Sequence, residues 1–151
     1  MSDRMPDLAL EWQGFAQFSP PELYALLRFR QAIFVVEQAS AYPDLDGLDA
    51  NARHLLLRAD GELGGCLRLV LSPLLRIGRV AVAPALRGRG LGRRLMDEAL
   101  RRCHVDHAGQ PVVLTAQAHL ERFYASFGFV TTSAPYDDFG VSHIDMQLPP
   151  P

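Results

Sequence analysis

The 151-residue sequence contains no lysine, so arginine supplies all of its permanent positive charge. A Walker-type phosphate loop, which needs a lysine before Ser or Thr, is therefore excluded. Cysteine is scarce too: Cys66 and Cys103 have no paired spacing, which excludes a disulfide framework and indicates a reducing compartment. No apolar run approaches membrane-spanning length, and the N-terminal residues lack the apolar core of a secretion signal. We therefore expect a cytoplasmic protein without a membrane anchor.

The remaining composition is that of an ordinary soluble globular protein, with 48% hydrophobic and 21% charged residues. The length predicts one domain, residues 1–151, with a substantial core. A net charge of -2 argues against nucleic acid as the main partner. Cys103, His104 and His107 share a helical spacing, but no second ligand cluster in the sequence completes a metal site, so we expect no metal.

The strongest functional signal lies between Arg76 and Met96. Glycines 88, 90 and 92 occur at alternate positions directly before a segment with helical apolar periodicity. Glycine lets a ligand approach the main chain, and the start of a helix presents free N–H groups and the positive end of its dipole. Nearby arginines add cationic side chains. Together these features predict an anion site for phosphate or pyrophosphate. A dinucleotide fingerprint fails here because Arg93 stands at its third glycine position.

Hydrophobic periodicity and turn residues predict a mixed α/β sheet in the order β-α-β-β-β-α-β-α-β-β. The expected strands cover 8–12, 54–59, 63–71, 76–82, 112–116, 130–133 and 143–148. The expected helices cover 19–36, the stretch from the glycine loop to about 103, and 119–126, with an acidic loop over 40–51 and a polar turn over 136–140. Asp60-Gly61 predicts a hairpin turn between the second and third strands.

The glycine loop reads Arg87-x-x-Gly90-x-Gly92 after a strand written Val80-x-Val82-x-Pro84. This pattern resembles the coenzyme A loop of the GNAT superfamily of N-acetyltransferases. The resemblance implies acetyl-CoA as co-substrate, with its pantetheine arm along the main chain of the strand and its pyrophosphate on the loop. The coenzyme-binding residues that it implies are Val80, Ala81, Val82, Arg87, Gly88, Arg89, Gly90, Leu91, Gly92, Arg93 and His119.

Tyr124 lies in HLERFYASFGF, which is similar to the GNAT signature of a tyrosine-bearing helix closed by Gly-Phe. The resemblance implies that Tyr124 protonates the leaving thiolate, a task that suits a neutral phenol. A core tyrosine on an amphipathic helix is the alternative. His119 stands where many family members carry asparagine. It either contacts the coenzyme, lies in the substrate cleft, or serves only to start the helix.

The general base has no clear candidate in the motifs. Many GNAT enzymes carry an acid on the central strand, where this sequence has Gly78 and Arg79. Glu37, at the end of the first helix, is the base that we predict. Polar residues of the acidic loop and the hairpin are expected to bind the substrate, unless they are a solvated loop and a satisfied buried pair; these are Asp46, Asp49, His54 and Arg68.

Longer motifs extend the resemblance over nearly the whole chain and point to the ElaA-like branch of GNAT proteins. They are Arg30-x-x-x-Phe34-Val-Val-Glu37-Gln38, Tyr42-Pro-Asp44-x-Asp46-Gly-x-Asp49, Arg53-His54 and Ala116-Gln117-Ala118-His119-Leu120. The resemblance implies direct acetyl transfer to a primary amine of a small molecule or peptide. We also expect a homodimer. Two alternatives stay open: an acyl-CoA sensor without turnover, and an enzyme that uses a longer acyl thioester.

Overall fold

The computed structural model describes residues 4–150. Its strands are β1 (Leu8–Gly14), β2 (Ala52–Ala59), β3 (Glu62–Val70), β4 (Leu75–Val82), β5 (Val112–Gln117), β6 (Val130–Thr131), β7 (Tyr136–Asp138) and β8 (Val141–Leu148). Its α-helices are α1 (Pro20–Gln31), α2 (Leu91–Asp106) and α3 (Glu121–Ala125), and α1 continues into a π-helical segment, Ala32–Glu37. The mixed α/β sheet that the sequence predicts is confirmed. None of the helices within residues 4–150 is long and apolar enough to cross a membrane.

Local chemistry fixes the ends of these elements. The hydroxyl of Ser19 accepts the N–H of Glu22, and the Glu22 carboxylate accepts the N–H of Ser19 in return, so α1 begins with a capping box. Between β2 and β3, Asp60 and Gly61 have φ values of 50° and 83°, which close the predicted hairpin with a two-residue turn.

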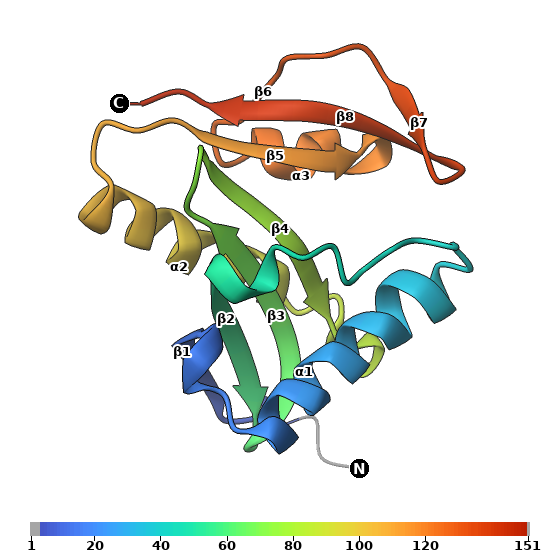
Figure 1. Ribbon diagram of the computed structural model, residues 1–151, viewed down its shortest axis with the longest axis vertical. Helices are drawn as coiled ribbons and strands as arrows, with labels where there is room; N and C mark the ends of the chain where they lie inside the picture. The colour runs from blue at the N-terminus through green and yellow to red at the C-terminus, as the bar shows by residue number, and fades with distance from the viewer. Residues whose placement is uncertain (1–3, 151) are drawn as a thin grey trace.

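The sheet has the order β1-β2-β3-β4-β5-β8-β6, with β7 paired to β8 (Figure 1). Strands β4 and β5 run parallel and pair at only two positions, Leu75 with Val112 and Arg76 with Val113. Beyond them the two strands diverge, as the ribbon shows (Figure 1). The sheet therefore consists of two antiparallel halves, β1–β4 and β5–β8, that meet at one short parallel junction.

Alternation along β2 and β3 places apolar side chains on both faces of the first half. One face packs against α2, and Leu55 and Leu67 of that face and Leu95 of α2 are each at most 1% exposed. The other face packs against α1 through Leu26 and Leu56. Burial on both faces makes this half a rigid support for the edge of β4.

The structure corrects two details of the sequence-based expectations. The predicted polar turn over 136–140 is wrong at its start, because 136–138 form β7, paired with β8. The reversal is made by Phe139 and Gly140 alone, with φ values of 51° and 84°. A phenylalanine is an unusual residue for a left-handed turn position, which is why the sequence conceals it. The predicted strand over 130–133 is shorter than expected and ends at Thr131.

Candidate active site

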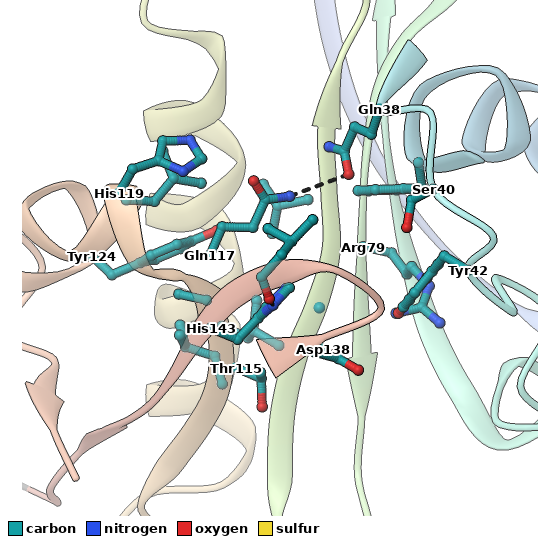
Figure 2. A pocket seen from close by; sticks show the side chains of 18 of the residues that line it. Gln38, Ser40, Tyr42, Arg79, Thr115, Gln117, His119, Tyr124, Asp138 and His143 are labelled. Carbon is teal, nitrogen blue, oxygen red and sulfur yellow. Dashed lines mark hydrogen bonds between the residues drawn. The ribbon is translucent and has the colours of Figure 1, made fainter. Parts of the chain in front are cut away.

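The candidate site is the opening between β4 and β5. Two cavities of about 430 and 510 Å³ meet in this opening, and both are lined by Val80, Arg87, Leu120 and Tyr124. The first cavity extends over the polar face of β5 and β8 (Figure 2). The second extends from β4 to the N-terminus of α2. After the ligands that the sequence resemblance leads us to expect there, we call them the acceptor cavity and the coenzyme cavity. The divergence of the two strands is thus the feature that creates a continuous site.

The lining of the coenzyme cavity includes a glycine-rich stretch of main chain. Gly88 and Gly90 have φ values of 80° and 76°, and a Cβ added to either one would meet nothing within 4 Å. Gly90 is the N-cap of α2, whose first turn has no side-chain cap and no acidic residue. The free N–H groups at this helix end, with two arginines lining the cavity, fit a phosphate group.

Most of the predicted coenzyme residues lie together in this cavity: Val80, Ala81, Val82, Arg87, Gly88, Gly90, Leu91, Gly92 and Arg93. Arg89 is exposed and lies outside both cavities. His119 lines the acceptor cavity.

The edge of β4 facing the opening has no strand beside it beyond Arg76. On the opposite edge, β3 pairs with Gly78 and Ala81, so Arg79 and Val80 form a bulge in the ladder. Arg79 has a φ of 51°, and its carbonyl accepts a hydrogen bond from the thiol of Cys66 at 3.3 Å. Complete burial raises the pKa of Cys66 to about 12, so the sulfur keeps its proton and remains a donor. The bulge is therefore held by a hydrogen bond from β3, and the other edge of β4 is open toward the cavities.

Tyr124 stands on α3 at the junction of the two cavities. Its ring is 8% exposed and packs edge-to-face against Phe123 and Phe129, with centroids 5.0 and 6.4 Å away. Burial raises the pKa of Tyr124 to about 12. The phenol is therefore neutral at physiological pH and can donate its proton.

Polar side chains cover the acceptor side of the opening, from β4, β5, β7, β8, the segment after α1 and the turn before α3. They include Gln38, Ser40, Tyr42, Arg79, Thr115, Gln117, His119, Asp138 and His143 (Figure 2). The amide of Gln117 donates to the amide oxygen of Gln38 at 3.2 Å, across the opening (Figure 2). Nearby, the Tyr42 ring packs edge-to-face on Phe139 with centroids 5.8 Å apart. These contacts join the acidic loop to the second half of the sheet.

Three arginines and three aspartates form a closed ring of ion pairs beside the acceptor cavity. Going around it, the members of this arginine–aspartate ring are Arg30, Asp44, Arg79, Asp46, Arg68 and Asp49. The separations run from 2.6 Å for Arg30 Nη1 to Asp49 Oδ1, to 3.2 Å for Arg68 Nη1 to Asp49 Oδ1. Arg79 Nε lies 2.8 Å from Asp44 Oδ1 without the angle of a hydrogen bond, so that contact is an ion pair only. Each arginine pairs with two carboxylates, which suits the guanidinium fork.

The ring explains where the predicted substrate residues lie. Asp46 and Arg68 line an outer cavity of about 410 Å³ next to the acceptor cavity, but both are already paired within the ring. Asp49 and His54 lie outside all three of these cavities. The Nε2 of His54 donates to the carbonyl of Asp49 at 3.0 Å, and burial lowers the pKa of His54, so its ring is neutral. These residues hold the acidic loop in place.

Glu37 lies outside both cavities and is bound by Arg87, whose Nη2 is 2.7 Å from Glu37 Oε1. The hydrogen bonds from Arg87 lower the pKa of Glu37. A carboxylate with a lowered pKa is a weaker base than a free one. Glu37 is thus placed to orient Arg87, which lines both cavities. Within residues 4–150, no three His, Cys, Asp or Glu side chains are grouped to hold a metal ion.

The sequence reasoning did not single out His143 or Thr115. One signal could have found His143: along β8, His143 and Asp145 alternate with the buried Ile144 and Met146, which marks a polar sheet face. Arg30 was seen only as a residue of the first helix and as the start of one ElaA-like motif, without a partner. Its position on the apolar side of that helix was a sign of a buried, paired charge.

A family model described as an acetyltransferase (GNAT) domain matches residues 26–149. The chain therefore belongs to the GNAT acetyltransferase family, whose acyltransferase fold it has. It is 42% identical over 146 residues to the protein ElaA of Escherichia coli strain K12, with 91% of this chain and 95% of ElaA covered. The predicted resemblance to the ElaA-like branch is confirmed.

Solved structures agree with this assignment. An acyl-CoA N-acyltransferase from Pseudomonas aeruginosa matches with a TM-score of 0.88 and 39% identity, covering 93% of this chain and 99% of that one. The E. coli ElaA structure matches with a TM-score of 0.85 and 41% identity, covering 92% and 99%. The acyl-homoserine lactone synthase LasI shares the fold at 14% identity and a TM-score of 0.75, with 95% and 90% covered.

Proposed function

We propose that this chain is an acetyl-CoA-dependent N-acetyltransferase that acylates a primary amine of a small molecule or peptide by direct transfer in a ternary complex. One observation carries the proposal: a cavity lined by the uncapped start of a helix and a polar cavity meet at a buried, neutral tyrosine. The first cavity suits the coenzyme and the second suits the amine. Acetyl-CoA supplies an activated thioester, and the chain supplies the means to hold and use it.

The coenzyme end binds through the main chain. The N–H groups at the start of α2, with Arg87 and Arg93 nearby, neutralise the pyrophosphate. The open edge of β4 offers Val80 and Val82 as hydrogen-bonding partners for the pantetheine amides, as an added strand would. His119, which lines the acceptor cavity, stands close to where coenzyme and acceptor meet.

Tyr124 acts when the carbon–sulfur bond breaks. The amine nitrogen forms a bond to the thioester carbon, and sulfur leaves as a thiolate that takes the phenolic proton. Burial keeps that proton on the phenol before the reaction. Because the charge on sulfur exists only late in the reaction, this contact stabilises the transition state more than the bound ground state.

Two other functions compete with this proposal. An acyl-CoA sensor without turnover is favoured by the lack of an acid at Gly78 and Arg79 on β4. A longer acyl group is the other alternative, and the many polar groups around the acceptor cavity favour a short one. The cytoplasmic location of the protein and its assembly as a homodimer stay predictions.

The deciding experiment follows thiol release from acetyl-CoA, butyryl-CoA and octanoyl-CoA with a panel of aliphatic amines, aromatic amines and peptide N-termini. We expect amine-dependent thiol release that is fastest with acetyl-CoA, and an N-acetyl product by mass spectrometry. Calorimetric binding of acetyl-CoA without thiol release for any amine would instead support the sensor. Faster release from octanoyl-CoA would support the longer thioester.

A further inference from the structure

His143 on β8 is held in one tautomer by the main chain. Its Nδ1 lies 2.8 Å from the carbonyl oxygen of Val141. A carbonyl oxygen only accepts hydrogen bonds, so Nδ1 must donate and carries the proton of the neutral ring. Nε2 is then left with a free lone pair. A neutral imidazole in this tautomer is a ready proton acceptor.

The position of His143 in the sheet places it in the lining of the acceptor cavity. In the strand register it stands opposite Gln117 of β5 and Tyr136 of β7. It lines both the acceptor cavity and the outer cavity, on the polar side of the opening, and Tyr124 lies on α3 at the far end of the acceptor cavity (Figure 2). The Tyr136 ring lies beside the imidazole, with centroids 6.5 Å apart and the two ring planes tilted by 30°.

Four carboxylates near the opening are paired with arginines and are therefore less suited to act as the base. Asp44, Asp46 and Asp49 are held in the arginine–aspartate ring, and Glu37 is held by Arg87. Asp138 lines the acceptor cavity at the end of the β7–β8 hairpin, where its charge attracts an ammonium group.

Building on the proposed function, we propose that His143 is the general base that deprotonates the acceptor amine, with Asp138 drawing the ammonium to it. One ammonium proton moves to Nε2 of His143, and the freed lone pair forms the bond to the thioester carbon. The carbon–sulfur bond breaks, and the thiolate takes the Tyr124 proton. The second proton of the nitrogen restores the phenol, directly or through water, and His143 releases its proton to solvent. The acid and the base then work from different elements of the cleft.

The tautomer of His143 can be tested by NMR, without a measurement of turnover. In protein labelled with ¹⁵N in histidine, the His143 resonances are assigned by their loss in His143→Gln. We expect the neutral ring to carry its proton on Nδ1, with Nε2 showing the shift of an unprotonated nitrogen. A ring protonated mainly on Nε2 would overturn the proposal, because its lone pair would face the Val141 carbonyl.

The catalytic role is tested by thiol release from acetyl-CoA with ethanolamine, which is protonated at neutral pH, and hydroxylamine, which is not. For His143→Gln we expect a loss in kcat/KM of about 10²–10⁴-fold with ethanolamine and a clearly smaller loss with hydroxylamine. Calorimetric affinity for acetyl-CoA should be unchanged. His104→Gln, at an exposed histidine in the last turn of α2, is the matched control and should behave as wild type.

Three outcomes contradict the proposal. Unchanged turnover in His143→Gln, or equal losses with both amines, would remove His143 as the base while leaving the acetyltransferase intact. Weaker acetyl-CoA binding in His143→Gln would make it a binding residue. A wild-type protein that binds acetyl-CoA but acylates neither these amines nor the wider panel would refute the proposed function, and the role of His143 would fall with it.

Discussion

The cleft between β4 and β5 has a coenzyme end and an acceptor end, and different parts of the chain form the two ends. Most of the coenzyme end comes from one continuous stretch, from Val80 to Arg93, whose glycines leave main chain uncovered, and Leu120, Phe123 and Tyr124 complete its lining. The acceptor end comes from side chains on β4, β5, β7, β8 and the segment after α1. A site made of main chain needs a particular local sequence, whereas a site made of side chains needs a particular fold.

The ends also differ in charge. At the coenzyme end, Arg93 packs over the Phe127 ring at 4.5 Å and donates to the hydroxyl of Ser126, so its charge has no carboxylate partner in these contacts. At the acceptor end the three arginines of the ring face three aspartates, and their charges cancel. One end is thus suited to a polyanion, and the other to a small group that brings its own charge.

The largest effect is expected from Gly90→Val, which tests whether the coenzyme end depends on main-chain approach. A branched side chain at a φ of 76° is strained, and it would also fill the space beside the start of α2. We expect acetyl-CoA binding by titration calorimetry to be lost. Gly109→Val is the matched control, because Gly109 has a φ of 81° and open surroundings away from the cleft. Arg89→Ala should cost little, and wild-type affinity in Gly90→Val would contradict this account.

The next largest effect is expected from Tyr124→Phe. This change removes the hydroxyl that lies where the two cavities meet and keeps the packing of the ring. We expect kcat and kcat/KM to fall together by about 10²-fold or more, with unchanged affinity for acetyl-CoA. Steady-state and single-turnover thiol release give these values. The raised pKa of Tyr124, about 12, predicts that the phenol stays protonated, and so able to donate, throughout the neutral and mildly alkaline range. Unchanged single-turnover rates in Tyr124→Phe would reduce Tyr124 to a packing residue.

Arg30→Met tests whether the acceptor end depends on the ring. Arg30 is 1% exposed, and its loss leaves Asp44 and Asp49 without one of their two partners. Breaking a buried ion pair from one side costs about 3–5 kcal/mol of unfolding free energy. Urea unfolding measures the loss. Arg28→Met, at an exposed position on the same helix, is the control and should change stability by less than about 0.5 kcal/mol. Similar losses in both variants would mean that the helix, and not the ring, sets the effect.

The smallest effect is a pH dependence carried by Asp46. Partial burial alone would raise its pKa, but hydrogen bonds from Arg68 and the Leu48 amide, with the charges of Arg68 and Arg79, lower it from 3.8 to about 2. A carboxyl whose pKa is lowered by folding stabilises the protein above its unfolded pKa. That contribution is lost as the pH falls from 3.8 toward 2. Urea midpoints across this window should therefore change less with pH in Asp46→Asn than in wild type. Parallel curves would show that Asp46 titrates alike in both states.

The sequence predicted the local structure of the coenzyme end, a strand followed by a glycine loop and a helix, because its determinants are local. Glycines at alternate positions, a proline after the strand and an apolar helix period lie within one short stretch. The contacts of the acceptor end could not be predicted in the same way, because its partners are remote in sequence. Glu37 meets Arg87 fifty residues later in the chain, and His143 gains its surroundings from the register of β5, β7 and β8. The acidic loop was correctly predicted to be polar. The arginines with which its aspartates pair could not be predicted, because the fold brings them together.

The short junction between β4 and β5 also has a consequence for cooperativity. Among residues 4–150 it is the one parallel pairing, whereas β5 and β8 pair at six positions within their own half. The half made of β5–β8 should therefore open as a separate unit in native-state hydrogen exchange, at a lower free energy than global unfolding. A coenzyme in the opening touches both halves and would have to leave before they separate. At a hundred times its Kd it should add about 2.7 kcal/mol to that opening, so binding would merge two exchange units into one.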